Sequence, residues 1–283
     1  MLIGVSACER LAESGRGSKE RPMAQLFENR VKHLLKAGKK TAGAWSQLCS
    51  SASTEILCRA GFDWILIDLE HSPNDTQTLL WQLQAMNGYG VVPIVRAPWN
   101  DLVWIKRILD AGAYGVMIPS VNTREQAIAA VQACKYPPLG VRGIAGSPRA
   151  AGFGRDTASY LKRANDEILV ILQVETPQSI ANLDEIGKVP GVDVLFIGPM
   201  DLSTVMGHLG NLTHPEVQAA IATVEAKAKA LGIPLGTVSA GWDQAKALYE
   251  RGYQFVTLMS DVILLSRGSA DVLAKFREVF LQG

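Results

Sequence analysis

The sequence predicts a single (β/α)8 barrel, and three observations support this. Short apolar runs alternate with amphipathic helical stretches along most of the chain, which is typical of parallel strands joined by helices. Eight such runs can be counted, the number of strands in a closed barrel of this class. The 261 residues that follow the first 22 of the chain's 283 also suit a fold that typically takes roughly 250.

The order of the expected elements supports the same fold. The expected strands are Thr41–Trp45, Trp64–Asp68, Val91–Arg96, Gly115–Ile118, Ile168–Val174, Val194–Ile197, Leu235–Ser239 and Phe255–Met259. Helical spacing of apolar residues predicts the helices Gln25–Lys36, Asp75–Asn87, Leu102–Ala111, Thr123–Ala133, Pro177–Ile186, Pro215–Ala230, Trp242–Arg251 and Ile263–Phe280. An open doubly wound sheet is the alternative, but Trp45–Ser50 lacks the Gly-x-Gly-x-x-Gly turn that such a sheet would carry after its first strand.

Two segments fall outside the repeating pattern. Residues 1–22 are rich in Ser, Gly, Arg and Glu and have no period, so we expect a loose extension before a barrel domain of residues 23–283. The connection Tyr136–Asn165 is long and contains several glycines. Long connections of this kind commonly act as lids or interface elements.

The composition disfavours several classes of protein. The chain is 48% hydrophobic and 19% charged with a net charge of +1, which disfavours a disordered chain and a nucleic-acid-binding protein. The cysteines, Cys8, Cys49, Cys58 and Cys134, match neither metal-ligand spacing nor a disulfide framework. No apolar run reaches the roughly 18 residues of a membrane span. We therefore expect a cytoplasmic protein with reduced thiols and no membrane partner.

Polar residues gather where the expected strands end. Barrel enzymes place their reacting groups at the carboxyl ends of the strands. Here the second strand ends in Asp68-Leu-Glu70-His71, the third in Arg96 and the fifth in Gln173-Val-Glu175, and the sixth runs into Asp201. We therefore expect these groups to share one rim of the barrel. No lysine lies within or at the end of any expected strand, which disfavours Schiff-base chemistry.

Glu175 and Asp201 follow consecutive strands, so their carboxylates are expected to converge. Two close carboxylates repel each other unless one is protonated or a cation lies between them. A site made of oxygen ligands favours Mg²⁺, Mn²⁺ or Co²⁺. The alternative is a glycosidase pair of acid and nucleophile, but only Trp45, Trp64 and Trp99 are expected near this rim to line a saccharide cleft.

Arg96 and His71 are the other candidate catalytic residues. A cation at the end of an apolar strand is costly unless it is paired, so Arg96 is expected either to bind a carboxylate or enolate or to form an internal ion pair with Asp68 or Glu70. His71 can transfer protons at neutral pH. Its cooperation with Asp68 requires the chain to bend after the strand, because strand alternation places the two residues on opposite faces.

Six motifs in order resemble the HpcH/HpaI aldolase family, which comprises metal-dependent pyruvate aldolases. The motifs are Gly43–Trp45, Phe62–His71, Pro93–Arg96, Pro137–Gly143, Gln173–Thr176 and Phe196–Ser203. One difference is Met200, where relatives often have Ala. A bulkier pocket wall would follow from this difference.

The resemblance implies a set of roles and an assembly. A divalent metal would be held by Glu175 and Asp201, with Arg96 near the keto oxygen of pyruvate and Gln173 close by. His71, assisted by Asp68, would transfer the proton. Asp110 would reach the pocket of a neighbouring subunit in a hexamer built as a trimer of dimers.

We therefore expect a class II lyase that reversibly splits 4-hydroxy-2-oxo acids into pyruvate and an aldehyde. Selectivity for the aldehyde is expected to lie in Met200, Val238, Trp45 and the Tyr136–Asn165 connection. An acyl-CoA lyase of the malyl- or citramalyl-CoA type and a catalytically silent barrel that binds a keto acid are the alternatives.

Overall fold

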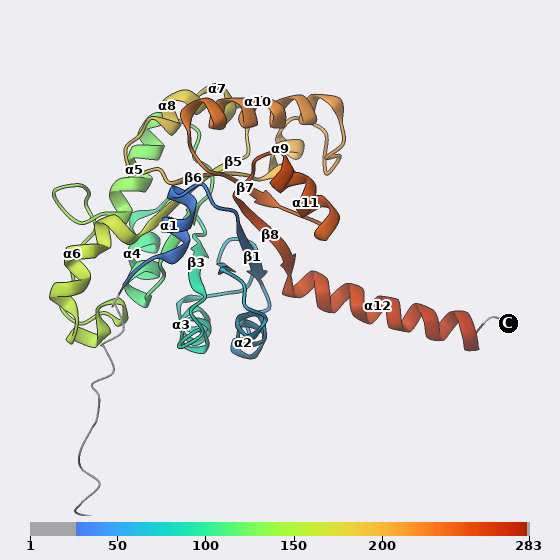
Figure 1. Cartoon of the computed structure of the whole chain (residues 1–283), viewed down its shortest axis with the longest axis horizontal. Coiled ribbons are helices and arrows are strands. Elements are labelled where there is room, and N and C mark those ends of the chain that lie inside the picture. The colour runs from blue at the N-terminus through green and yellow to red at the C-terminus, as the bar shows by residue number, and fades with distance from the viewer. Residues whose placement is uncertain (1–26, 282–283) are drawn as a thin grey trace, which may run out of the picture.

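The computed structural model describes residues 27–281, in which eight parallel strands form a closed barrel (Figure 1). Each strand pairs with the next along the chain, and β8 pairs with β1. The predicted barrel is confirmed, and the open sheet is excluded because the β8–β1 pairing closes the ring and leaves this sheet with no edge strand. The strands are β1 (Thr41–Ser46), β2 (Trp64–Asp68), β3 (Val92–Arg96), β4 (Gly115–Ile118), β5 (Leu169–Val174), β6 (Val194–Ile197), β7 (Leu235–Val238) and β8 (Phe255–Ser260).

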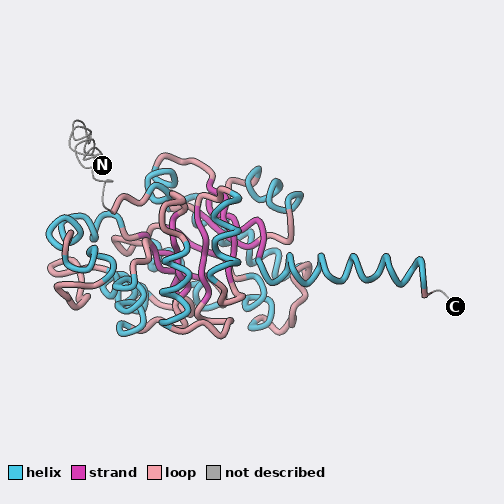
Figure 2. Tube along the Cα trace, turned by 90° about the horizontal axis from the view of Figure 1, so that it is seen from below, coloured by secondary structure: helices cyan, strands magenta, loops and turns pink. Residues whose placement is uncertain are grey.

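Helices surround the strands on the outside of the barrel (Figure 2). They are α1 (Arg30–Lys36), α2 (Ser51–Ala60), α3 (Thr76–Ala85), α4 (Leu102–Ala111), α5 (Arg124–Cys134), the 3₁₀ helix η2 (Arg149–Gly154), α6 (Thr157–Glu167), α7 (Pro177–Ala181), α8 (Leu183–Gly187), α9 (Pro199–Val205), α10 (Pro215–Leu231), α11 (Trp242–Glu250) and α12 (Asp261–Phe280). The predicted extension of residues 1–22 lies outside the described residues. Among residues 27–281, no helix combines the length and hydropathy needed to cross a bilayer.

Large apolar side chains fill the barrel interior. Trp64 and Phe255 stack with ring centroids 3.8 Å apart and an angle of 3° between the ring planes. Gly43 makes this possible, because a Cβ atom at that position would lie only 2.3 Å from the Trp64 ring. At the amino end of the strands, Val31 and Leu35 of α1 join the same cluster. The interior is therefore a packed core, and a barrel enzyme of this kind places its reacting groups at the carboxyl ends of the strands.

The Tyr136–Asn165 connection is not a plain loop and does not cover the carboxyl ends of this chain's strands. It contains η2 and most of α6. Because it joins the end of α5 to the start of β5, it lies at the amino end of the barrel, where Arg149 donates hydrogen bonds to the backbone oxygens of Ala111 and Leu83. The prediction of a lid is wrong for this chain's own site, whereas a role at an interface stays a prediction.

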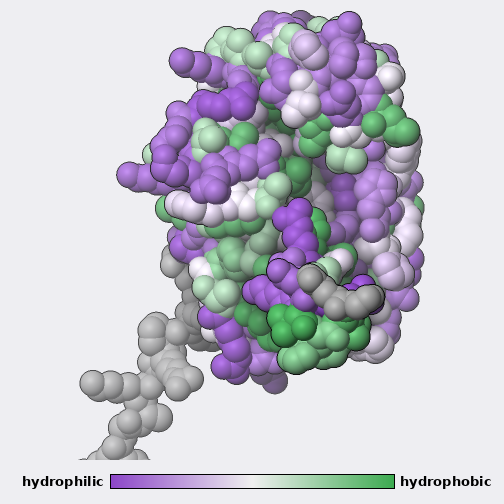
Figure 3. Space-filling view, turned by 90° about the vertical axis from the view of Figure 1, so that its right-hand side faces the viewer, coloured by the Kyte–Doolittle hydropathy of each residue, from purple (hydrophilic) through white to green (hydrophobic). Residues whose placement is uncertain are grey.

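Helix α12 extends away from the barrel (Figure 1). It packs against β1 and β8 only near its start. Figure 3 looks toward its free end and shows hydrophobic side chains beside hydrophilic ones on this part of the surface. The exposed apolar residues of this segment include Leu264, Leu265, Val272, Leu273, Phe276, Val279 and Phe280. One face of α12 thus has no apolar partner within the described part of the chain.

Candidate active site

Asp68 and Arg96 form a buried ion pair at the carboxyl ends of β2 and β3. They are direct partners in the strand register, and alternation along the strands places both on the side of Leu66 and Ile94, inside the barrel. Arg96 donates from Nε to Oδ1 of Asp68 over 2.8 Å and from Nη2 to Oδ2. The internal ion pair that the sequence left as an alternative is therefore present.

Arg96 has two further contacts. Its Nη1 atom lies 3.0 Å from Oε2 of Glu70, and its guanidinium carbon lies 4.7 Å from the centroid of the Trp45 ring. Burial opposes ionisation of Asp68, but the hydrogen bonds and charge of Arg96 outweigh it and hold the pKa of Asp68 below its usual value. Asp68 is thus a carboxylate at neutral pH that orients the Arg96 guanidinium.

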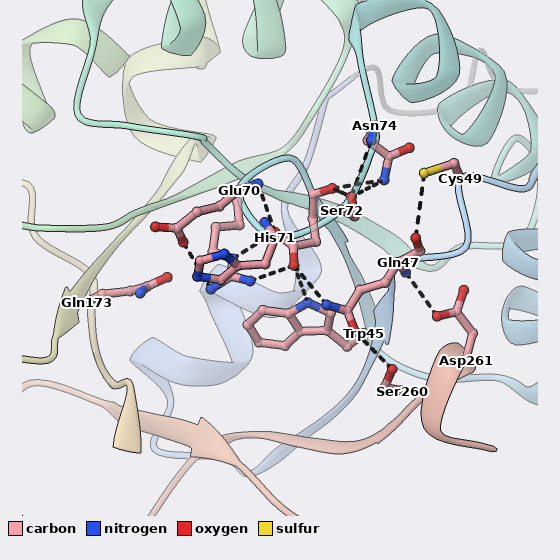
Figure 4. A network of polar contacts seen from close by, with 12 residues as sticks. Trp45, Gln47, Cys49, Glu70, His71, Ser72, Asn74, Gln173, Ser260 and Asp261 are labelled. Atoms are coloured by element: carbon pink, nitrogen blue, oxygen red, sulfur yellow. Dashed lines mark hydrogen bonds and ion pairs between the residues drawn. The ribbon is translucent and has the colours of Figure 1, made fainter. Parts of the chain in front are cut away.

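Asp68 also fixes the segment that carries His71. Its Oδ1 atom accepts hydrogen bonds from the backbone N–H groups of Glu70 (2.9 Å) and His71 (3.2 Å), so the chain bends after the strand as the sequence argument requires. Its Oδ2 atom accepts from Nε1 of Trp45 and Nε2 of Gln47, both over 3.1 Å (Figure 4). The His71 side chain is exposed. Asp68 therefore reaches His71 through its backbone.

Glu70 has an unusually high pKa for a carboxyl group. Burial is the largest influence on its pKa, and the negative charges of Glu175, Asp68 and Asp201 add to it, while Arg96 acts in the opposite direction. Together they raise the pKa of Glu70 to about 7. Glu70 is consequently a carboxylate at this rim that gains and loses its proton near neutral pH.

Glu175 lies one residue beyond β5 and is buried. Its Oε1 atom accepts a 2.6 Å hydrogen bond from the backbone N–H of Ser120, and its Oε2 atom accepts one from Nε2 of Gln173. Ser120 has a φ of 58°, a left-handed conformation that is uncommon for a residue with a side chain. Burial is the main cause that raises the pKa of Glu175, and the charge of Asp201 adds to it.

The turn that carries Asp201 passes close to Glu175. A Cβ atom at Gly198 would lie 3.0 Å from Oε2 of Glu175, so the turn approaches this carboxylate closely and leaves little room for a side chain at position 198. Asp201 follows in the first turn of α9 and is exposed. In the same place, Oε1 of Gln173 is buried and has no hydrogen-bond partner within the described residues. Two carboxylates with mutual repulsion and a free amide oxygen form a donor set that fits a hard divalent cation.

The other predicted substrate-binding residues divide into two groups. Trp45 lies in the interior cluster, 6.0 Å from Phe196 between ring centroids, and Val238 packs against that cluster. Met200 is 55% exposed beside Asp201. These three give the rim an apolar wall.

Asp110 lies elsewhere in the chain. It comes near the carboxyl end of α4, on the opposite side of the barrel from the ends of the strands, and its Oδ1 atom lies 2.7 Å from Nη2 of Arg142. Arg142 is fully buried. Only a second subunit could bring Asp110 to a site of the kind described, so its role stays a prediction.

Two residues at the rim, Gln47 and Ser120, were missed in the sequence, and Glu70 was named there only as a possible ion-pair partner of Arg96. Gln47 connects Asp68 to the start of α12, since its Oε1 atom accepts from Ser260 Oγ over 3.2 Å and its backbone N–H donates to Asp261 over 2.9 Å. Ser120 holds Glu175, and Glu70 pairs with Arg96. The position of Glu70 between Asp68 and His71 indicated that it lies at the site. Gln47 and Ser120 also follow strands, but nothing in the sequence around them indicates a role at the site.

A closed eight-stranded barrel with charged groups at the carboxyl ends of its strands defines a (β/α)8-barrel enzyme. Residues 41–267 match the family described as HpcH/HpaI aldolase/citrate lyase. The chain is 45% identical over 250 residues to a 4-hydroxy-2-oxo-heptane-1,7-dioate aldolase of Klebsiella pneumoniae, covering 88% of this chain and 94% of that protein. It is 42% identical over 254 residues to a 5-keto-4-deoxy-D-glucarate aldolase of Escherichia fergusonii, covering 90% and 99%.

A solved structure agrees with these relatives. The structure of a family protein from Burkholderia cenocepacia superposes with a TM-score of 0.84 at 38% identity, covering 88% of this chain and 99% of that one. This chain belongs to the HpcH/HpaI aldolase/citrate lyase family. It is a carbon–carbon lyase of the aldolase type.

Proposed function

We propose that this lyase is a metal-dependent class II aldolase that reversibly cleaves 4-hydroxy-2-oxo acids into pyruvate and an aldehyde. The observation that carries the proposal is the approach of the Gly198–Asp201 turn to buried Glu175, at the same rim as the Asp68–Arg96 pair. The names of the curated relatives support the substrate class, since both describe aldolases of oxo acids.

Glu175 and Asp201 would hold the divalent metal, Mg²⁺, Mn²⁺ or Co²⁺. When bound, such an ion acts as a Lewis acid that stabilises negative charge on a 2-oxo acid. Before it binds, Gln173 and Ser120 keep Glu175 fixed through their hydrogen bonds. The chain therefore presents a rigid carboxylate and a more accessible one, Asp201, to the same small space.

Arg96 would stabilise the enolate that forms when the C3–C4 bond breaks. Asp68 holds two nitrogens of its guanidinium, so the plane of Arg96 is fixed before substrate arrives, which is the condition for effective electrostatic stabilisation. The third nitrogen, Nη1, faces Glu70. Because Glu70 loses its charge near pH 7, the substrate oxygen can replace it as the partner of Nη1.

His71 would take the proton of the 4-hydroxyl group during cleavage, directly or through a water, and return it during condensation. Its loop is held at both ends by Asp68, through the backbone N–H of His71 and through the Asp68 carbonyl, which accepts from Asn74 over 2.8 Å. A positioned base of this kind typically contributes about 10²–10⁴-fold. Trp45 and Val238 would supply an apolar wall, and Met200 would limit the size of the aldehyde.

The protein is proposed to act as a homo-oligomer in the cytoplasm, a hexamer built as a trimer of dimers. The exposed apolar face of α12 supports an oligomer, and the free thiols of Cys49, Cys58 and Cys134 support a reducing compartment. Replacing Val272 and Phe276 together by Asp should reduce the molar mass measured by light scattering. An unchanged mass would show that α12 is not the interface.

Exchange of the methyl protons of pyruvate in D₂O, followed by NMR, tests the chemistry. Exchange should be lost with EDTA, return with added Mn²⁺, and be abolished in Glu175→Gln. Persistent exchange in metal-free enzyme would remove the metal from the mechanism. Turnover of an acyl-CoA substrate, but not of 4-hydroxy-2-oxo acids, would favour the acyl-CoA lyase, and binding without any turnover would favour the silent barrel.

A further inference from the structure

Two histidines and a glutamate meet on the segment that follows α9. They are His208, in the loop after α9, His214, the residue before α10, and Glu216, in the first turn of α10. One potential ligand atom from each side chain lies within 4.8 Å of the other two. None of the three belongs to the rim described above, and their nitrogen donors differ from the oxygen donors of Glu175 and Asp201.

The contacts within this cluster bring metal-ligating atoms together. Nε2 of His208 lies 2.8 Å from Oε2 of Glu216. The rings of His208 and His214 stack with centroids 3.4 Å apart and planes 17° apart. The cluster thus places two imidazoles and a carboxylate beside one another.

Helix capping and a simple ion pair do not account for the whole arrangement. Nδ1 of His214 accepts a 3.3 Å hydrogen bond from the backbone N–H of Glu216, which is long for this bond type, and this cap does not need His208. The ion pair of His208 with Glu216 does not need His214. Two stacked imidazoles cannot both carry a positive charge without repulsion, whereas two neutral imidazoles can share one cation.

We propose that His208, His214 and Glu216 bind one Zn²⁺ ion at a site separate from the aldolase centre. Zinc accepts imidazole and carboxylate ligands at about 2.0–2.2 Å, and three protein ligands leave a fourth position for water. The ligand atoms must draw closer than in the present arrangement. Glu216 can do so because its side chain is 69% exposed.

Zinc at this site would tie the loop after α9 to the start of α10. The backbone N–H of His208 donates a 2.8 Å hydrogen bond to the carbonyl of Ser203 in α9, the helix that begins with Pro199 and carries Asp201. The ion would therefore stabilise the segment that presents Asp201. The proposal does not depend on the proposed aldolase reaction.

The test measures zinc in a chain whose other candidate metal site has been removed. In Glu175→Gln/Asp201→Asn, EDTA-stripped protein titrated with Zn²⁺ by calorimetry should bind one ion per chain. X-ray absorption at the zinc edge should show two imidazole ligands. Adding His208→Ala should weaken zinc binding roughly tenfold or more, as should adding Glu216→Gln, and circular dichroism checks that each variant is folded.

His33→Ala is the matched control, because His33 is another partly exposed histidine with glutamate partners, Glu28 and Glu167, but without a second histidine. It should leave the zinc affinity unchanged. The proposal is overturned if the background variant binds no zinc, or if folded His208→Ala and Glu216→Gln variants bind it as tightly as their parent.

Discussion

Replacing Asp68 by Asn tests the part of the site on which the other roles depend. The substitution keeps the shape of the side chain and removes its charge. The Asp68 carboxylate accepts six hydrogen bonds, from Nε and Nη2 of Arg96, from Trp45 and Gln47, and from the backbone N–H groups of Glu70 and His71. An Asn side chain has only one acceptor oxygen. The donors that now bond to one of the two Asp68 oxygens would therefore face the NH₂ group of the new side chain, which is itself a donor.

The expected loss of stability in Asp68→Asn depends on the partner that Arg96 keeps. Removing one member of a buried ion pair typically costs about 3–5 kcal/mol. Glu70 stays 3.0 Å from Nη1 as a counter-charge, so we expect the lower end, about 3 kcal/mol, in the free energy of unfolding. Because Arg96 and the His71 loop both lose their anchor, kcat should also fall by about 10²-fold or more.

Two assays separate the structural effect from the catalytic one. Urea unfolding followed by tryptophan fluorescence gives the stability, and release of pyruvate gives kcat. Glu167→Gln is the control, since Glu167 is a buried acid at the amino end of the barrel that accepts from the Asn29 N–H over 2.8 Å. It should lose stability and keep kcat. If Asp68→Asn lost stability and kept kcat in the same way, Asp68 would have only a structural role.

Three further predictions concern single side chains at the rim. Glu70→Gln should remove a pH dependence of stability. Since the pKa of about 7 in the folded chain lies above the ordinary value of 4.5 for a glutamate, the folded wild-type chain binds the proton more tightly and loses stability as the pH rises between these values. Urea unfolding in EDTA should show this loss in the wild type only. Gln47→Gly should lower kcat more than it raises KM, because it removes a bond to Asp68 without touching the substrate pocket; equal effects would place Gln47 in the pocket. Met200→Ala should improve kcat/KM for bulky aldehydes by roughly 10-fold relative to small ones, and an unchanged aldehyde panel would show that Met200 does not border the substrate.

The strands could be predicted from the sequence almost to the residue. Each expected strand boundary lies within one residue of the observed one. The reason is that strands of a parallel barrel are covered on both sides and therefore appear as continuous apolar runs between polar turns. Glu175 and Asp201 could be named as candidates, because Glu175 directly follows β5 and Asp201 lies in the first turn after β6, and their role as metal ligands stays a prediction.

Other features leave little trace in the sequence. Helix α6 is mostly polar and buries only Tyr160, Ala164 and Glu167, so it carries few apolar residues to mark it and the segment resembled a loop, although those buried residues have helical spacing. The predicted helix Pro177–Ile186 is divided at Asn182 into α7 and α8. The hydrogen bond from Ser120 to Glu175 depends on a left-handed backbone at a residue other than glycine, which no composition rule indicates.

The pairing of Asp68 with Arg96 shows how register determines the chemistry of the rim. Neighbouring strands place these residues opposite each other and facing inward, where water is excluded, so Arg96 must pair with Asp68 whatever substrate arrives. Glu175 faces inward by the same alternation from Gln173, but among residues 27–281 no cationic side chain forms an ion pair with it. The interior thus pairs the Asp68 carboxylate with a cation, whereas the Glu175 carboxylate has no such partner in the described part of the chain and has a raised pKa. This difference between two inward acids of one barrel is the physical reason to expect the added cation at Glu175 and not at Asp68.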